Sequence, residues 1–95
     1  MRRIQLSTKA ILEFEESWAW YEEQQEGLGD KFEIQLLTKL TEIQKNPNRY
    51  PNKEKKYREA ILKKYPFIII YYFNEEEIIV TSIFHTSRNP KRKYI

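Results

Sequence analysis

The stretch that decides the fold lies in the second half of the chain. It contains two apolar runs, Tyr65-Pro-Phe-Ile-Ile-Ile-Tyr-Tyr-Phe73 and Ile78-Ile-Val-Thr-Ser-Ile-Phe84, separated by the polar residues 74–77. β-Branched and aromatic residues on both sides of a short polar loop predict an antiparallel β-hairpin with strands at 66–73 and 78–84. A further β segment is expected just before it, at 57–62.

Both faces of this predicted hairpin are apolar, since side chains alternate along a strand. In the first strand one face carries Phe67, Ile69, Tyr71 and Phe73, and the other carries Ile68, Ile70 and Tyr72. In the second strand one face carries Ile78, Val80, Ser82 and Phe84, and the other carries Ile79, Thr81, Ile83 and His85. A sheet that is apolar on both faces needs two covers. We expect helices on one face and a separate partner on the other, with the C-terminal tail or the proline loop as the alternative cover.

The N-terminal half predicts one short strand and two helices. Residues 3–6 alternate as in a strand, Ser7 and Thr8 are candidate N-caps, and Gly27-Leu28-Gly29 separates two helical stripes. The first stripe is Ile11, Phe14, Trp18 and Tyr21; the second is Phe32, Leu36, Leu40 and Ile43, with Asp30 as its expected N-cap and 46–51 as its end.

The fold class that follows is α+β, in the order β-α-α-β-β-β. An antiparallel sheet carries the N-terminal helical hairpin on one face. Ninety-five residues suffice for one domain, which we place at 1–95.

Composition limits the function classes. The chain has no cysteine and a single histidine, so no cofactor or metal site is expected. The longest apolar run, 65–73, is far shorter than the roughly 20 residues of a membrane helix, and the N-terminus lacks the apolar run of a signal peptide. We therefore expect a cytoplasmic protein that does not bind membranes.

Charge is unevenly distributed along the chain. Residues 1–44 hold nine acidic and five basic side chains, a net −4, whereas residues 45–95 hold five acidic and twelve basic ones, a net +7. The basic half can attract an acidic protein or a phosphate backbone, or it can act only as a solvated surface.

Short motifs in a fixed order resemble the RelE/ParE superfamily of toxins from type II toxin–antitoxin systems. They are Trp20-Tyr21-Glu22-Glu23-Gln24, Gly27-Leu28-Gly29-Asp30-Lys31-Phe32, Asn46-Pro47-Asn48-Arg49-Tyr50-Pro51, Tyr57-Arg58 with Leu62 and Tyr65-Pro66-Phe67, and Ile83-x-His85-x-x-Arg88-x-Pro90. The resemblance covers nearly the whole chain. It implies a bacterial growth-arrest toxin, also linked to plasmid stabilization, that a cognate antitoxin wraps and silences, as a dimer or heterotetramer.

Two activities are known in that superfamily. ParE-like members inhibit DNA gyrase, and RelE-like members cut messenger RNA on the ribosome. The helical-hairpin motif and the His-x-x-Arg ending look more like the ParE-like branch, which we favour. The alternatives are a RelE-like messenger RNA endonuclease and an inactive binding module of the same fold.

Metal-free RNA cleavage would need a base, a cation and an acid. Arg58 is the candidate cation and matches an arginine of RelE-like nucleases; its alternative is a salt bridge to Glu59 or to the first helix. His85 can exchange protons near neutral pH, or it can pin the tail to the sheet near Arg88. Tyr94 is the candidate acid or base-stacking platform.

Six basic residues are candidates for binding the target or the antitoxin: Lys55, Lys56, Arg58, Lys64, Arg88 and Arg92. Trp20 lies off the apolar stripe of the first helix. It is a candidate interface anchor, unless it packs beneath a neighbouring element.

Overall fold

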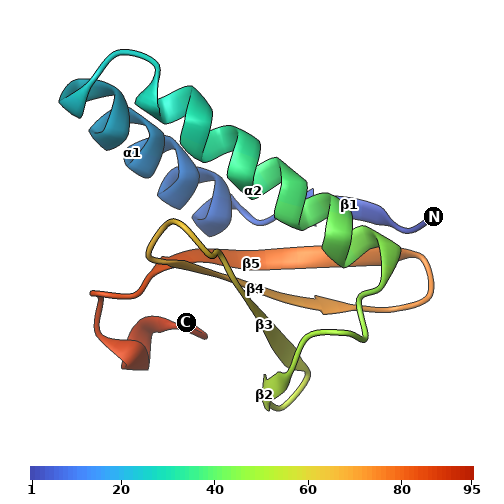
Figure 1. Cartoon of the computed structure of the whole chain (residues 1–95). Helices are drawn as coiled ribbons and strands as arrows, with labels where there is room; N and C mark the ends of the chain where they lie inside the picture. The colour runs from blue at the N-terminus through green and yellow to red at the C-terminus, as the bar shows by residue number, and fades with distance from the viewer.

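A computed structural model describes all residues, 1–95 (Figure 1). The elements in chain order are β1 (Arg3–Leu6), α1 (Thr8–Gln24), α2 (Leu28–Lys45), β2 (Asn52–Glu54), β3 (Tyr57–Ile61), β4 (Phe67–Phe73), β5 (Glu77–His85) and the 3₁₀ turn η1 (Pro90–Arg92). The α+β class and the predicted hairpin of β4 and β5 are confirmed. The three-residue strand β2 and the turn η1 were not predicted.

The five strands form one sheet in the order β1-β5-β4-β3-β2. The pairs among β2, β3, β4 and β5 are antiparallel, as expected, but β1 pairs in parallel with β5. The prediction of a wholly antiparallel sheet is therefore wrong at one edge. Ile4 lies opposite Ile78 and Leu6 opposite Val80. The last strand of the chain, β5, therefore lies between β1 and β4.

Both helices cover the same face of this sheet (Figure 1). The predicted stripe of α2 is confirmed, because Phe32, Leu36, Leu40 and Ile43 are all buried. In α1 the prediction holds only in part: Ile11 is 44% exposed, and the fully buried position is Ala10. Near the turn between the helices, α1 contacts α2 through aromatic rings: the ring centroids of Tyr21 and Phe32 lie 5.1 Å apart.

The glycine turn brings the two helices close together. Gly27 has φ of 89°, a left-handed conformation that favours glycine. At Gly29 an added Cβ would lie 2.8 Å from the Trp18 ring. The Glu22 carboxylate accepts hydrogen bonds from the amides of Gly27 and Gly29, both at 2.9 Å, and so satisfies free amides where α2 begins.

The predicted N-cap of α2 is wrong, whereas that of α1 is confirmed. Helix α2 begins at Leu28, so Asp30 lies inside its first turn and accepts a hydrogen bond from Trp18 Nε1 at 3.3 Å. The Ser7 hydroxyl accepts from the Ala10 amide at 3.1 Å and donates to the Thr81 carbonyl at 3.0 Å. Ser7 therefore caps α1 and also joins it to β5.

A β-bulge changes which side chains of β5 face the helices. The register shifts between Ile70 and Tyr71 of β4, whose partners are Ser82 and Val80. The extra residue in β5 reverses the alternation. Ile83 and His85 consequently lie on the helix-covered face with Val80, and Phe84 lies on the other face, contrary to the strict alternation predicted.

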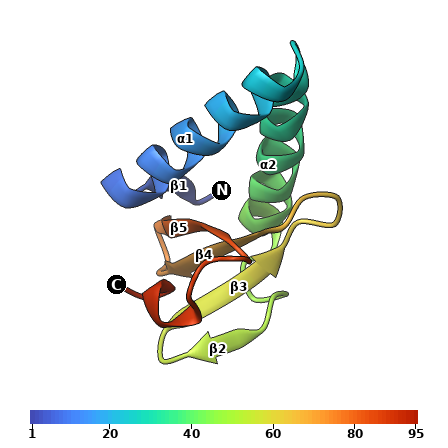
Figure 2. The ribbon, with the colours of Figure 1, turned by 90° about the vertical axis from the view of Figure 1, so that its left-hand side faces the viewer.

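The second face is covered in its centre by the chain itself, which corrects the expectation of a face left for a partner alone. The C-terminal tail crosses beneath the sheet, on the side opposite the helices (Figures 1 and 2). Lys93 Nζ lies 3.4 Å from a Glu59 oxygen and 5.9 Å from the centroid of Phe84. Glu59, Ile70 and Phe84 are accordingly buried, while Ile61 beside them is 66% exposed.

Candidate functional site

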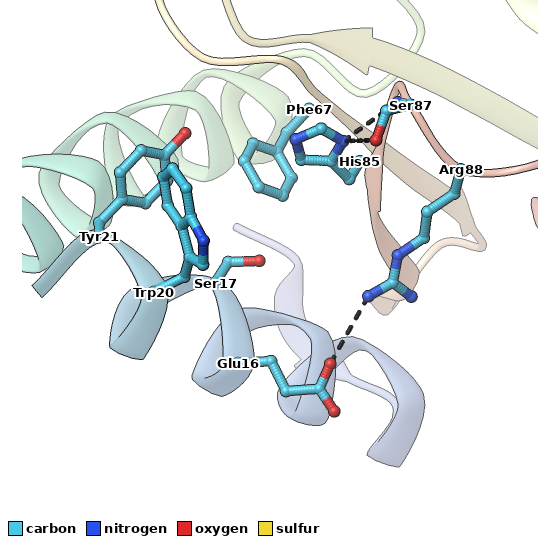
Figure 3. Close-up of a pocket in the computed structure, with 8 residues that line it drawn as sticks. All are labelled: Glu16, Ser17, Trp20, Tyr21, Phe67, His85, Ser87 and Arg88. Carbon is cyan, nitrogen blue, oxygen red and sulfur yellow. Dashed lines mark hydrogen bonds and ion pairs between the residues drawn. The ribbon is translucent and has the colours of Figure 1, made fainter. Parts of the chain in front are cut away.

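A cavity of about 310 Å³ opens where the end of α1 faces the ends of β4 and β5 (Figure 3). Phe67 forms its buried floor, and Trp20, 57% exposed, forms a wall beside Tyr21. The polar members of its lining are Glu16, Ser17, His85, Ser87 and Arg88. An apolar floor with a polar rim is the usual composition of a binding pocket.

His85 is held in place by the turn that follows β5. Its Nδ1 accepts a hydrogen bond from the Ser87 amide at 3.0 Å and lies 2.7 Å from the Ser87 hydroxyl (Figure 3). Its ring meets Phe67 edge-on, with centroids 4.9 Å apart. An Nδ1 that accepts from an amide places the proton of a neutral imidazole on Nε2. These contacts match the structural alternative for His85, which fixes the start of the tail.

Arg88 joins the tail to α1. Its guanidinium lies 3.6 Å from Glu13 Oε2 and 3.5 Å from Glu16 Oε2. The Glu13 side chain is only 8% exposed, and its other oxygen accepts from the Ser82 hydroxyl at 2.8 Å and the Ile83 amide at 3.0 Å. This buried carboxylate is therefore satisfied on both oxygens and connects α1, the bulge of β5 and the tail.

Arg58 lies on the helix-covered face of β3, where it supports the loop after α2. Its Nη1 donates to the carbonyl of Tyr50 at 2.8 Å and to that of Asn48 at 3.3 Å. The alternative for Arg58, a salt bridge to Glu59 or to the first helix, is not formed, and Glu59, the next residue along the strand, points to the opposite face. Nearby, the Tyr71 hydroxyl donates to the Pro47 carbonyl at 2.7 Å, and burial raises the pKa of Tyr71 to about 12.

Tyr94 lies on the second face of the sheet. Its hydroxyl donates to Glu59, and its ring packs 5.1 Å from that of Tyr57. Burial is the largest cause that raises the pKa of Tyr94, and the hydrogen-bonded Glu59 carboxylate raises it further. The tail residue is thus held by a buried acid whose charge Lys93 compensates.

The three residues that a nuclease would combine occupy three separate places. Arg58 pairs with Tyr71 at one end of β4, whereas His85 pairs with Phe67 at the other end. Tyr94 lies on the opposite face of the sheet, against Tyr57. The structure therefore does not bring Arg58, His85 and Tyr94 together.

The remaining candidate basic residues are exposed: Lys55, Lys56, Lys64 and Arg92. Lys55 has φ of 48° in the turn between β2 and β3. Lys56 Nζ lies 4.0 Å from the ring centroid of Tyr72, a cation–π distance. These exposed side chains can meet a partner, whereas Arg58 is engaged by two loop carbonyls. Arg88 is also exposed, but it is paired with Glu13 and Glu16.

Sequence reasoning missed Glu13 as a site residue. Helical spacing offered a signal for it, because Glu13 lies three residues after the buried Ala10 and four before Ser17. An acidic residue at an inward position predicts a buried partner. No local pattern identifies that partner, since Ser82 reaches it only through the bulge.

The fold and the site define a class of small α+β proteins in which a helical hairpin covers one face of a mixed sheet. The computed structure resembles a solved chain described as the chromosomal ParDE TA system from P. aeruginosa, with a TM-score of 0.78 and 17% sequence identity. That match covers 90% of this chain and 96% of the other. No curated protein matches the sequence.

Residues 4–90 match the family described as the ParE toxin of the type II toxin–antitoxin system, parDE. The chain therefore belongs to the ParE toxin family, and an antitoxin is its expected partner. This confirms the resemblance to the RelE/ParE superfamily. None of its helices is long and apolar enough to cross a membrane.

Proposed function

We propose that this chain is a toxin that arrests growth by binding and inhibiting DNA gyrase, and that it works in the bacterial cytoplasm until its antitoxin neutralises it. Membership of the ParE family supports the toxin role. The choice of gyrase over messenger RNA rests on one observation in particular, the separation of the three residues that cleavage would require.

In the nuclease hypothesis, base, cation and acid must reach one phosphate. Here the Arg58 guanidinium is occupied by two backbone carbonyls, and the Tyr94 hydroxyl is occupied by Glu59 on the other face. Binding and blocking a target needs no such convergence. This geometry favours a toxin that acts through its surface.

The target contact that we propose uses the exposed basic side chains, Lys55, Lys56, Lys64 and Arg92. Exposed cations speed encounter with an acidic surface and can remain paired after docking. Arg58 and Arg88 contribute indirectly, because each holds a loop or the tail in place through contacts inside the chain.

Two assays test the proposal. Purified gyrase is incubated with relaxed plasmid, ATP and increasing amounts of the toxin, and supercoiling is expected to fall. In parallel, primer extension on cellular messenger RNA after toxin induction is expected to show no new cuts. Supercoiling that is unaffected at toxin concentrations above that of gyrase contradicts the proposal, and new codon-linked cuts would support the nuclease instead.

A control variant makes the gyrase assay specific. Replacing Lys55 and Lys56 with glutamate reverses two exposed charges without touching the core, so the fold should remain while inhibition weakens. The matched change on the other side of the molecule is Lys31→Glu, at an exposed position of α2, which should inhibit like the wild type.

A further inference from the structure

A groove runs along one flank of α1 and contains two cavities that meet at one ion pair. The first is the cavity beside Trp20 and Phe67. The second, of about 460 Å³, is lined among others by Leu12, Phe84 and Arg92. Glu16 and Arg88 line both cavities, so the pair between them, 3.5 Å apart, divides the groove.

The groove presents one apolar anchor point in each cavity. Trp20 is 57% exposed and Leu12 is 52% exposed, and both lie on the flank of α1 that faces the tail. Eight residues of helix separate them, which corresponds to about 12 Å. A partner that fills both cavities must therefore carry two apolar side chains about 12 Å apart, eight residues apart in a helix or four in an extended strand.

The charges that line the groove indicate which kind of partner residue lies between those two apolar side chains. The exposed cations that line the groove are Arg88 and Arg92, and the half-buried Lys9 lies beside them with its ammonium group bonded to two tail carbonyls. Glu16 is the single exposed acidic side chain of the lining, because Glu13 is buried. The Glu16 side chain is 70% exposed, so its pair with Arg88 is weak and easily exchanged. A carboxylate of a partner can take the place of Glu16 while Arg88 keeps its contact with Glu13.

We propose that this groove is the docking site for a segment of the antitoxin that carries an acidic residue between two apolar anchors. One anchor enters the cavity at Trp20, the other enters the cavity at Leu12, and the acidic side chain pairs with Arg88. The proposal rests on the antitoxin partnership of the ParE family and not on gyrase as the target.

The first experiment reports on the groove directly. In a Trp18→Phe background Trp20 is the only tryptophan, so the fluorescence emission of the protein reports on the surroundings of this one wall of the cavity. Adding the purified antitoxin encoded in the same operon should shift this emission to shorter wavelength and protect it from acrylamide quenching. Unchanged emission at saturating antitoxin overturns the proposal.

The second experiment measures antitoxin affinity by calorimetry on folded variants. Trp20→Ala and Leu12→Ala should each weaken binding at least about tenfold, as expected of interface anchors. Ile34→Ala, a similarly exposed residue on α2, is the matched control and should change affinity less than about twofold. Equal losses in all three variants, or no loss in any, overturn the proposal.

The third variant tests the sign of the electrostatic step. Glu16→Gln removes the internal competitor for Arg88 and should tighten antitoxin binding by about two- to fivefold, the range of an exposed ion pair. Glu15→Gln, an exposed acid on the outer side of α1, should leave binding unchanged. Weaker binding of Glu16→Gln contradicts the proposal. Antitoxin affinity tests the docking groove, and the supercoiling assay tests gyrase as the target, so either proposal can fail while the other holds.

Discussion

Glu13 and Ser82 are 69 residues apart in the chain, yet the Ser82 hydroxyl donates to Glu13 Oε1 at 2.8 Å inside the protein. The same oxygen accepts from the Ile83 amide, and Arg88 lies 3.6 Å from the other oxygen. This carboxylate therefore fastens the first helix to the last strand at its bulge. Because Glu13 is buried, its loss would leave these donors without an acceptor.

Glu13→Ala should lower the free energy of unfolding by about 2–4 kcal/mol, because it leaves a buried hydroxyl and amide without their acceptor. Urea denaturation measures the loss. Glu13→Gln keeps one oxygen acceptor and should cost less. Glu15→Ala, on the exposed side of the same helix, should stay within about 0.5 kcal/mol; a similar loss at both positions would show that the helix itself, not the buried network, is responsible.

Arg58→Ala should lower the free energy of unfolding by about 1–3 kcal/mol, since it removes the donor from two loop carbonyls. Toxicity should then fall only as far as the amount of folded protein falls. Growth after induction and the thermal midpoint are measured together. A fully stable Arg58→Ala protein that has lost toxicity would show a direct role for this guanidinium at the target.

The raised pKa of Tyr71 and of Tyr94 predicts a specific alkaline behaviour. Both tyrosines ionise more readily when unfolded, at the ordinary value of 10.0. Their contribution to stability is thus complete below pH 10 and is lost as pH rises from there toward the folded-state values, about 12 for Tyr71. Burial also raises the pKa of Tyr21, so tyrosinate absorbance should show three of the seven tyrosines ionising late. Tyr94→Phe should remove one of them.

Loosening the tail should expose it to protease. Glu59 is buried and holds both Lys93 and the Tyr94 hydroxyl, so Glu59→Ala should release the tail from the sheet. Trypsin should then cut at Lys91 to Lys93 several times faster than in the wild type while the core remains intact. Glu54→Ala, an exposed acid on β2, is the control, and equal cutting rates for the two variants would argue against this tether.

Gly29→Ala should destabilise the helical hairpin by about 1–3 kcal/mol, because the new methyl group meets the Trp18 ring at 2.8 Å and the Glu22 carboxylate at 2.9 Å. Circular dichroism during thermal unfolding measures the change. Gln24→Ala, at the exposed last residue of α1, should be neutral. A neutral Gly29→Ala would mean that α1 and α2 can separate slightly at no cost.

The sequence by itself determined the elements whose signals are local. The stripe of Phe32, Leu36, Leu40 and Ile43, the glycine turn at Gly27, the Ser7 cap and the hairpin of two apolar strands follow from periodicity, backbone preference and side-chain hydrogen bonding. Such signals act over one or two turns, so they survive in the folded chain. The motifs also predicted the RelE/ParE superfamily, which the family match over residues 4–90 confirms.

Tertiary structure alone decided which distant residues meet. The bulge in β5 turned Ile83 and His85 toward the helices, the inserted last strand made the sheet mixed, and the tail covered the second face through Glu59 and Tyr94. Each depends on the register and packing of segments far apart in the chain, which no short pattern encodes. For the same reason, the separation of Arg58, His85 and Tyr94, and the groove beside α1, appear only when the chain is folded.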